Sequence, residues 1–307
     1  MNIIFFGSSD ESIQLLDEIS KDHTILAIVS KPLPKNSKRR KFTNPKLFEY
    51  TNKNNILFLD PFKLDVSFVE KIHSLEPDLS IVMSYGKILK KDLIDIPKYG
   101  TINIHPSLLP KYRGPSPVQT TILNQDNETG FTVIQMDEGV DTGDILYISK
   151  KYDLGLEETY LELLRFLFNE SSKIINNLLL LFENNKLSPQ KQINKLATHT
   201  GLIEKKSGKI DWNNDASSIY AKFRAFIEWP KIYSVFNKKR FIIHDLTISN
   251  YKSTSPGAIE KIDGKICVHT STEMIILSQI QFEGKKIIDA STYFNNFDLS
   301  KINLKTY

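Results

Sequence analysis

Short apolar runs alternate with helix-like segments through the first half of this 307-residue chain, and this alternation constrains the fold more than any other feature. Between the runs, Ser12–Ile19 and Val66–Leu75 space their apolar residues at helical intervals. Strands that are apolar along their whole length are buried on both faces, so the pattern predicts a Rossmann-like α/β fold: a mostly parallel sheet with helices on both faces. The predicted strands are Ile3–Phe6, Thr24–Val29, Leu57–Leu59, Leu79–Met83 and Ile102–Ile104.

The alternation of strands and helices ends with a long helical stretch, Leu156–Asn185, and the second half of the chain has a different pattern. A polar segment poor in aromatic residues follows (188–208), and then one helix, Ala216–Phe226. Short strands separated by tight turns complete the chain: Phe241–Ile243, Gly257–Ile262, Lys265–His269 and Met274–Ile280. These shifts predict three parts, which are an α/β domain (1–189), a linker (190–207) and a small OB-like β-barrel domain (208–307).

Several classes of protein are excluded by what the chain contains. A single cysteine, Cys267, excludes an intramolecular disulfide framework and a cysteine-rich zinc module. The longest apolar stretch, Leu178–Phe182, is far shorter than the ~20 residues that span a bilayer. The N-terminal residues, Met1–Gly7, lack the basic segment of a signal peptide and are predicted as a strand. A soluble, cytoplasmic protein is expected.

The net charge of +4 is distributed unevenly. From Lys206 to Tyr307 there are fifteen basic and ten acidic residues, whereas the other 205 residues hold twenty-five and twenty-six. A basic C-terminal third favours a polyanionic partner, although a solvated lysine-rich surface would give the same counts.

Common nucleotide-binding and hydrolase motifs are missing. The first predicted strand ends in Gly7, and the second and third glycines of a dinucleotide-binding turn are absent. The chain also has no Walker A sequence, no His-Glu-x-x-His pair and no Gly-x-Ser-x-Gly elbow. The sequence therefore disfavours NAD and FAD as ligands.

Asn103 and His105 form the first candidate for chemistry. Residues two apart on a strand point to the same side, and this pair runs into a proline-bounded loop, 106–110, where a strand ends. An amide donor beside an imidazole can stabilise an oxyanion and move a proton. Alone, such a pair more often has a structural role than a catalytic one.

An acidic loop, Met136–Asp144, is the second candidate. It holds carboxylates and glycines but not the spacing of an EF-hand calcium loop. Asp141 is the candidate partner for His105, because a carboxylate fixes the tautomer of an imidazole and favours its charged form. A solvated acidic turn remains the alternative interpretation of this segment.

Together the two motifs resemble those of the folate-dependent formyltransferase family. The run Asn-x-His-x-Ser-Leu-Leu-Pro begins at Asn103, and Asp141 stands in a loop of the form Asp-x-Gly-x-Asp-Thr-Gly-Asp. The resemblance implies that Asn103, His105 and Asp141 are catalytic, that 10-formyltetrahydrofolate is the formyl donor and that no metal takes part. It also implies folate-binding residues, namely Tyr85, Gly86, Ser107, Leu108, Leu109 and Pro110.

The C-terminal third resembles the family members that act on tRNA. The matching segments are Gly208–Trp212, Arg224–Phe226, Trp229-Pro230, Pro256-Gly257 and Phe282–Lys286. The resemblance implies a bacterial, monomeric transferase that formylates initiator methionyl-tRNA for translation initiation. Its aromatic residues are interpreted as core residues, so the order of the segments, and not an RNA contact, carries the resemblance.

A basic run after the second strand is the candidate tRNA contact within the first domain. Its four consecutive cations, Lys38, Arg39, Arg40 and Lys41, can neutralise phosphates. The match to the basic loop of the family is loose, because the family's Asp-Arg-Pro and glycine-rich stretch are missing from this chain. A solvated loop without a role is the alternative.

Three other functions are compatible with parts of the sequence. An amino-sugar-nucleotide N-formyltransferase would share the N-terminal motifs, and a formyltetrahydrofolate hydrolase would use water as the acceptor. A non-catalytic RNA-binding module is the alternative outside enzymes. In the favoured reaction Asp141, His105 or water could take the proton of the attacking amine.

Overall fold

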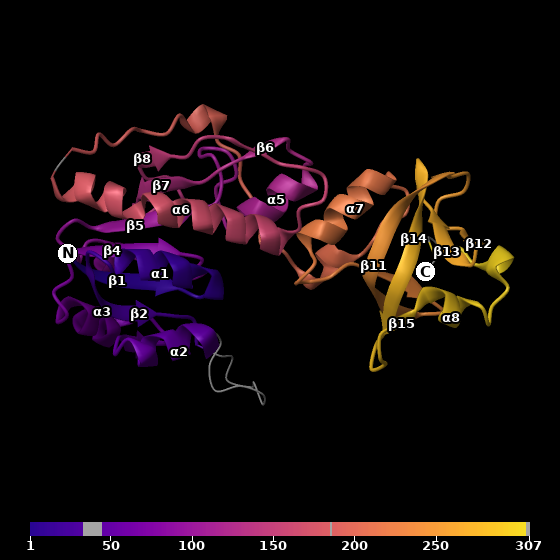
Figure 1. Cartoon of the computed structure of the whole chain (residues 1–307), viewed down its shortest axis with the longest axis horizontal. Helices are drawn as coiled ribbons and strands as arrows, with labels where there is room; N and C mark the ends of the chain where they lie inside the picture. The colour runs from indigo at the N-terminus through magenta and orange to yellow at the C-terminus, as the bar shows by residue number, and fades with distance from the viewer. Residues whose placement is uncertain (33–44, 185, 305–307) are drawn as a thin grey trace. The chain divides into compact units, whose positions relative to one another are not determined.

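The computed structural model describes residues 1–32, 45–184 and 186–304, and its first half is built on one seven-stranded sheet (Figure 1). The strand order is β3-β2-β1-β4-β5-β7-β8; the first five strands are parallel, and β7 and β8 are antiparallel to their neighbours. The predicted fold class is confirmed, and all five predicted runs are strands. The bounds are β1 (Asn2–Gly7), β2 (Thr24–Val29), β3 (Leu57–Leu59), β4 (Leu79–Met83), β5 (Thr101–His105), β7 (Thr132–Gln135) and β8 (Ile145–Ile148).

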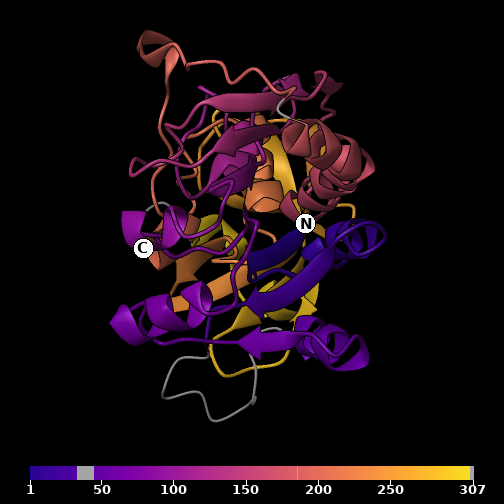
Figure 2. The same cartoon turned by 90° about the vertical axis from the view of Figure 1, so that its left-hand side faces the viewer.

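Helices cover both faces of this sheet. Helices α1 and α6 lie alongside each other in Figures 1 and 2, and the Asn176 side chain of α6 donates a hydrogen bond of 2.7 Å to the Glu18 carbonyl oxygen. On the other face, Phe68 of α3 packs in one buried cluster with Ile4 and Phe6 of β1. The bounds are α1 (Ile13–Ile19), α2 (Pro45–Lys53), α3 (Val66–His73), α4 (Lys91–Ile94), α5 (Pro117–Leu123) and α6 (Tyr160–Glu183).

Helix α6 begins later than the predicted stretch Leu156–Asn185, at Tyr160. The preceding residue, Thr159, fixes this start, because its backbone N–H and its hydroxyl donate to the Glu162 carboxylate at 2.9 and 2.7 Å. A threonine followed three residues later by a glutamate is a capping box, which satisfies helix N–H groups that have no partner within the helix.

The C-terminal part is a six-stranded antiparallel sheet with the order β10-β11-β14-β13-β12, and β15 pairs with β14. The predicted strand Phe241–Ile243 covers only the first part of β11. After Ile243, shifts of register against β14 interrupt the regular pairing. Trp212 is buried and donates to the Ser234 hydroxyl at 3.0 Å, which supports its interpretation as a core residue. The bounds are β10 (Tyr233–Phe236), β11 (Lys239–Lys252), β12 (Ile259–Ile262), β13 (Lys265–His269), β14 (Glu273–Phe282), β15 (Ile288–Asp289), α7 (Ala216–Ala225) and α8 (Ala290–Phe294).

The remaining elements are short. A two-stranded ladder pairs β6 (Glu128–Thr129) with β9 (Tyr152–Asp153). Short 3₁₀ helices lie at Asp10–Ser12, Asn194–Leu196, Lys205–Gly208 and Leu299–Lys301. Among residues 1–32, 45–184 and 186–304, no helix is both long and apolar enough to cross a membrane.

The chain divides into two compact units. Residues 190–201, which the sequence predicts as part of a linker, belong to unit 1 in this division, and Arg113 pairs there with His199 in a parallel β-bridge. Unit 1 comprises Met1–Pro117, Glu128–Asp153 and Leu164–Gly201; unit 2 comprises Val118–Asn127, Leu154–Leu163 and Leu202–Tyr307.

Candidate active site

Strand β5 presents the first two predicted catalytic residues. Asn103 and His105 lie two residues apart near its carboxyl end, so their side chains leave the same face of the sheet. The strand is paired on both sides, by β4 and β7, which fixes its position. His105 is only 4% exposed and Asn103 is half-buried. The pair therefore stands in a site that is largely shielded from water, where electrostatic interactions are strong.

The acidic loop joins β7 to β8 and turns tightly on its glycines. A Cβ atom at Gly143 would lie 1.7 Å from the Gln135 carbonyl oxygen, so a side chain there would push the loop away from β7. Asp137 accepts hydrogen bonds from the Gly139 N–H at 3.0 Å and the Thr142 hydroxyl at 2.6 Å. The Asp137 carboxylate therefore holds the loop together from within.

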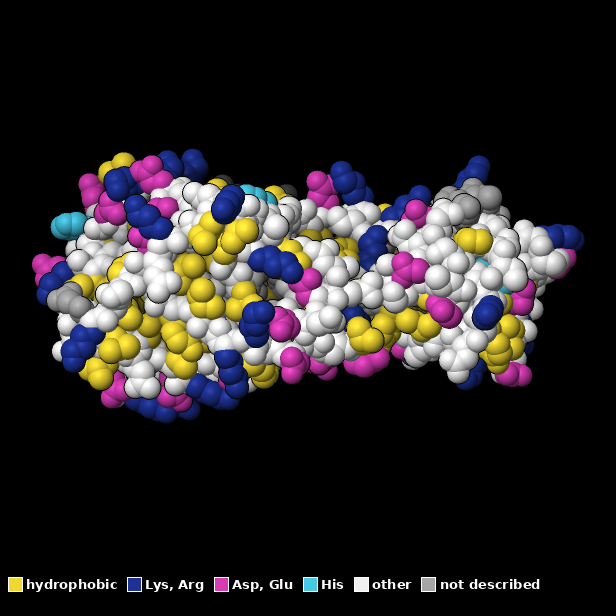
Figure 3. Space-filling model, turned by 90° about the horizontal axis from the view of Figure 1, so that it is seen from above, with side chains coloured by type: hydrophobic (Ala, Val, Ile, Leu, Met, Phe, Trp, Pro, Cys, Tyr) yellow, Lys and Arg dark blue, Asp and Glu magenta, His cyan; other side chains and the backbone are white. Residues whose placement is uncertain are grey.

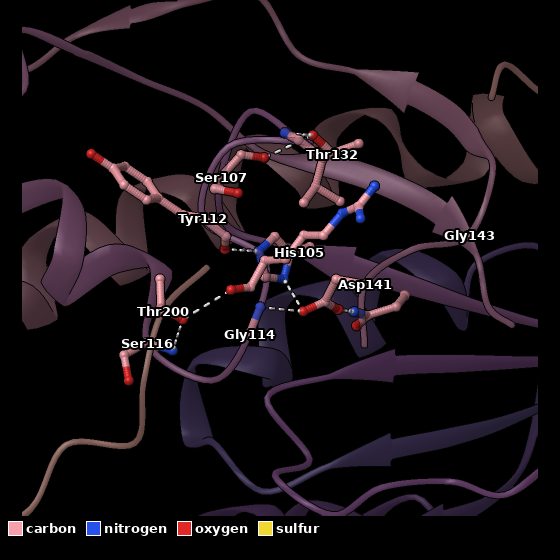
Figure 4. Close-up of polar contacts among 12 residues, drawn as sticks. His105, Ser107, Tyr112, Gly114, Ser116, Thr132, Asp141, Gly143 and Thr200 are labelled. Atoms are coloured by element: carbon pink, nitrogen blue, oxygen red, sulfur yellow. Dashed lines mark hydrogen bonds and ion pairs between the residues drawn. The ribbon is translucent and has the colours of Figure 1, made fainter. Parts of the chain in front are cut away.

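Asp141 is the residue on which the site converges (Figure 4). One carboxylate oxygen accepts a hydrogen bond of 3.1 Å from the Asn103 amide. The other oxygen accepts the Gly114 N–H at 2.8 Å and lies 3.5 Å from Nδ1 of His105. Asp141 itself has a φ of +54°, a left-handed backbone conformation that non-glycine residues rarely adopt. The structure thus brings together all three residues predicted to be catalytic.

The second ring nitrogen of His105 is also held. Its Nε2 lies 2.9 Å from the carbonyl oxygen of Tyr112, and because a carbonyl only accepts, Nε2 carries a hydrogen. Nδ1 faces the Asp141 carboxylate, which likewise only accepts. With Nε2 directed at the Tyr112 carbonyl, Nδ1 is the ring nitrogen that faces Asp141, 3.5 Å from its carboxylate oxygen.

The loop after β5 carries predicted folate residues whose side chains point in different directions. Ser107 donates to the Lys111 carbonyl at 2.6 Å, and Leu109 is buried. Both side chains serve the fold of the loop. Leu108 and Pro110 alternate with them and are half-buried, so they present more surface to a ligand.

The other predicted folate residues follow β4. The Tyr85 ring is buried edge-on against Phe6 with a centroid distance of 5.4 Å, and burial raises the pKa of its hydroxyl. Tyr85 is therefore a core side chain. The next residue, Gly86, has a φ of +68°, and a Cβ there would come within 2.9 Å of the Lys31 ammonium nitrogen. Burial and then the charge of Lys31 lower the pKa of Lys87, which donates to the Pro61 carbonyl.

Three residues at the site could not be identified from side-chain types in the sequence. The carbonyl of Tyr112 and the N–H of Gly114 hold His105 and Asp141, but these are backbone groups that any residue could supply. Thr132 is fully buried, and its hydroxyl bridges the Ser107 carbonyl at 2.7 Å and the Leu109 N–H at 3.0 Å. Tyr112 and Gly114 lie just after the predicted proline-bounded loop, 106–110, and this position is the signal that could have pointed to them.

A hollow of ≈ 360 Å³ lies beside the acidic loop. Its walls combine carboxylates, backbone and the apolar side chains of Ile94 and Met136. Within the described ranges no cluster of histidine, cysteine and carboxylate side chains could hold a metal ion. The predicted tRNA contacts Lys38, Arg39, Arg40 and Lys41 lie outside the residues that the structure describes. The hollow is lined by Lys91, Ile94, Asp95, Met136, Asp137, Glu138 and Gly139.

Comparison with known families accounts for both parts of the chain. Residues 1–176 match the formyl transferase family, and residues 202–298 match the C-terminal domain of formyl transferases. The chain belongs to the formyl transferase family. Asn103, His105 and Asp141 all lie within the N-terminal match.

Curated relatives extend over the whole chain. It is 33% identical over 304 residues to the methionyl-tRNA formyltransferase of Clostridium acetobutylicum, covering 97% of this chain and 98% of the relative. It is 34% identical over 311 residues to that of Prochlorococcus marinus, covering 94% of each. These relatives therefore match the C-terminal part of the chain as well as its N-terminal part.

Solved structures share the fold at lower identity. A sugar 3N-formyl transferase crystallised with dTDP and 5-N-formyl-THF has a TM-score of 0.67 at 21% identity and covers 93% of this chain and 99% of its own. The HypX protein of Aquifex aeolicus in complex with tetrahydrofolic acid has a TM-score of 0.65 at 16% identity, covering 96% of this chain and 47% of its own. These likenesses establish the formyl transferase fold.

Proposed function

We propose that this chain transfers the formyl group of 10-formyltetrahydrofolate to the α-amino group of methionine on initiator tRNA. The observation that carries the proposal is the convergence of Asn103, His105 and Asp141 at the end of β5. The methionyl-tRNA formyltransferases that resemble the chain along nearly its whole length support the choice of acceptor.

The site supplies what acyl transfer to an amine requires. The neutral amine attacks the formyl carbon, and the carbonyl oxygen becomes an oxyanion. Asn103 uses one amide hydrogen on Asp141 and has a second to donate to that oxyanion. We assign a hydrogen to Nδ1 of His105, which lies 3.5 Å from the Asp141 carboxylate, and propose it as a second donor to the oxyanion. The bond from the carbon to N10 of the folate then breaks, the amine loses a proton and N10 gains one.

The folate is proposed to lie against the acidic loop. The hollow of ≈ 360 Å³ is within the size range of small-ligand sites, roughly 300–1,000 Å³, and its mixed walls suit a flat heterocycle that carries several donors. The exposed side chains of Ile88 and Val140 are apolar groups on the two segments that would meet the ligand. Gly86, Leu108 and Pro110 do not line this hollow and stay predicted contacts of the same molecule.

The C-terminal sheet carries a second hollow, of ≈ 650 Å³, which we assign to the tRNA. On the face shown in Figure 3, basic and acidic side chains are intermixed, so net charge alone does not locate a partner. Five cations line this hollow together with the Glu283 carboxylate and the rings of Phe282 and Tyr293, whose centroids are 4.2 Å apart. Clustered cations neutralise RNA phosphates, and a half-buried aromatic side chain such as Tyr293 is a group on which a base can stack. The cations are Lys238, Lys239, Arg240, Lys285 and Lys286.

A formyl transfer assay decides between this proposal and its alternatives. Purified protein is incubated with 10-formyltetrahydrofolate and initiator methionyl-tRNA, and formyl-methionine is measured after the ester is hydrolysed. Its formation supports the proposal. We propose that the chain acts in the bacterial cytoplasm, where this tRNA is charged. One copy of the chain holds every residue that the proposal uses.

The second candidate acceptor is an amino-sugar nucleotide, because a solved sugar formyl transferase shares the fold over 93% of this chain. Transfer to such a sugar with no transfer to methionyl-tRNA would contradict the proposal. Formate release without any amine would identify a hydrolase, and tRNA binding without transfer would identify a non-catalytic RNA-binding module.

A further inference from the structure

Gln192 holds the acidic loop from outside it. The residue lies in the polar segment that follows α6, between the two ranges matched by the formyl transferase family. Its side-chain amide donates two hydrogen bonds of 2.8 Å, one to the carbonyl oxygen of Asp141 and one to that of Gly143. Gln192 is 9% exposed, so water competes little for these two carbonyls. The contacts bracket Thr142 and fix the backbone on both sides of it.

Arg113 fixes the orientation of Gln192. Its guanidinium donates from Nε at 3.0 Å and from one terminal nitrogen at 2.8 Å to Oε1 of Gln192, and also reaches the Asn194 side-chain oxygen at 2.8 Å. A guanidinium has only donors, so the amide oxygen must face Arg113 and the NH₂ group must face the loop. The two residues therefore form one clamp with a defined direction.

The charge of Arg113 makes a purely stabilising role a poor explanation. Arg113 is 4% exposed and forms no ion pair with any residue in the described ranges. The side chains that accept its hydrogen bonds, Gln192 and Asn194, are neutral amides. Burying a cation among neutral groups costs free energy that apolar packing would not cost. A need to hold the acidic loop in one position at the site explains why a buried cation is present there.

The same segment also reaches the partner of His105. The Arg113 N–H donates to the Thr198 carbonyl at 2.9 Å, and the Tyr112 N–H donates to the Thr198 hydroxyl at 2.8 Å. Tyr112 is the residue whose carbonyl holds Nε2 of His105. One polar stretch of chain thus fixes the backbones on which both His105 and Asp141 depend.

We propose that Arg113 and Gln192 are positioning residues for formyl transfer, which keep the Asp141 carboxylate in register with Asn103 and His105. The role in formyl transfer rests on the proposed function, whereas the anchoring of the acidic loop by Arg113 and Gln192 does not depend on it. Asp141 needs such anchoring because its left-handed backbone conformation is sparsely populated and persists only where surrounding contacts impose it. Neither residue touches the reacting atoms in this assignment.

The test replaces Gln192 by glutamate, which keeps the shape and the acceptor facing Arg113 but removes the NH₂ donors. The matched control is Gln190→Glu, the same chemical change two residues away on an exposed side chain. Gln192→Glu is expected to lower kcat roughly 10- to 100-fold, as displacement of a catalytic group by about 1 Å does, and to leave KM for methionyl-tRNA unchanged. Hydrogen exchange of the backbone amides at residues 137–144 is expected to accelerate in this variant alone.

A second pair of variants tests whether the two residues act together. Arg113→Lys keeps the cation but loses the two-pronged contact, so it is expected to reproduce the fall in kcat in a milder form. In the double variant Arg113→Lys/Gln192→Glu, kcat is expected to be no lower than in Gln192→Glu, because both changes disable one clamp. Effects that multiply would show that the residues act independently and would overturn the clamp.

The remaining outcomes separate this inference from the proposed function. A Gln192→Glu protein with the kcat of Gln190→Glu, or with a loss that only follows its folded fraction, overturns the positioning role. If the unmodified chain forms no formyl-methionine, the proposed function fails, and hydrogen exchange alone then decides on the anchoring: unchanged protection of residues 137–144 in Gln192→Glu would refute it.

Discussion

The proposed catalytic cluster and the basic hollow of the C-terminal sheet are built in opposite ways. Asn103, His105 and Asp141 are buried or half-buried, and their polar groups are held by neighbours. Around the hollow, Lys238 and Lys285 are exposed, and neither pairs with an acid in the part of the chain that is described. Transition-state stabilisation requires donors that are already in place, whereas phosphate binding requires cations that are free to replace counterions.

This contrast assigns a different kinetic signature to each region. Changes in the catalytic cluster should lower kcat and leave tRNA affinity intact. Changes around the hollow should raise KM for tRNA, alter its dependence on salt and leave kcat intact. A variant that shows the signature of the other region would break the comparison.

The largest effect is expected from Asn103→Ala. Loss of one oxyanion donor typically lowers turnover by about 10²–10³, and Asn103 also orients Asp141, so kcat should fall at least that far. Asp141→Asn should be similarly inactive because it removes the charge beside His105. The checks are kcat for formyl transfer, tRNA binding and circular dichroism, with the exposed Asn52→Ala as control. Full activity of either purified variant would refute the assignment of the catalytic residues.

The basic run Lys38–Lys41 is expected to give the next largest effect. Alanine at all four positions removes four charges that can each neutralise a phosphate, so KM for tRNA should rise on the order of tenfold or more. Kinetics with respect to the folate should not change. Unaltered kinetics with tRNA at low and high salt would show that this run is a solvated surface and does not belong with the hollow.

Removing charge at the hollow should have a smaller effect of the same kind. The triple variant Lys238→Ala/Lys239→Ala/Lys285→Ala should raise KM for tRNA. The slope of log KM against log salt concentration should also fall by roughly 1 for each phosphate that is no longer neutralised. The matched control is Lys252→Ala/Lys265→Ala/Lys301→Ala, which removes equal charge from exposed sites elsewhere in unit 2. Equal effects of the two triple variants would mean that net charge, and not the hollow, binds the tRNA.

The smallest effect is expected on stability, in unit 2. Asp215 caps helix α7 by accepting from the Ser218 N–H at 2.7 Å, so Asp215→Ala should cost about 1 kcal/mol of unfolding free energy. Hydrogen bonds from Ser217 and Ser218 lower the pKa of Asp215. The cap therefore contributes fully above the unfolded pKa of roughly 4, and its contribution is lost as the pH falls through the folded pKa. Denaturant unfolding at pH 7 and below pH 4 checks both points; a difference from the parent that grows on acidification would contradict them.

The sheet of unit 1 could be predicted because its signal is local. Buried strands such as Thr24–Val29 are apolar along their whole length, and the structure reproduces those bounds. Helix boundaries set by side-chain caps are harder to predict. The cap at Thr159 makes α6 start at Tyr160, four residues after the apolar pattern begins at Leu156. The extent of β11 depends on pairing with β14, which is distant in sequence, so only the start of the strand was apparent.

The candidate site shows the same division. Asn103, His105 and Asp141 could be picked out because side-chain chemistry and spacing identify them. The groups that hold them are a carbonyl of Tyr112, an N–H of Gly114 and an amide in a polar stretch. Backbone groups leave no mark on residue type, and a glutamine among lysines and asparagines is typical of a loop. The supporting contacts therefore became visible only in three dimensions.

The place of residues 190–201 has a consequence for exchanging modules between related enzymes. A chimera that keeps this catalytic unit and takes another acceptor-binding module would be joined near residue 189 if polar composition were the guide. That junction would discard Gln192 and Thr198 together with the old module. A junction after Gly201, where unit 1 ends, keeps them with the chemistry that they support. Recombination between family members, in the laboratory or in evolution, should tolerate the later crossover and not the earlier one.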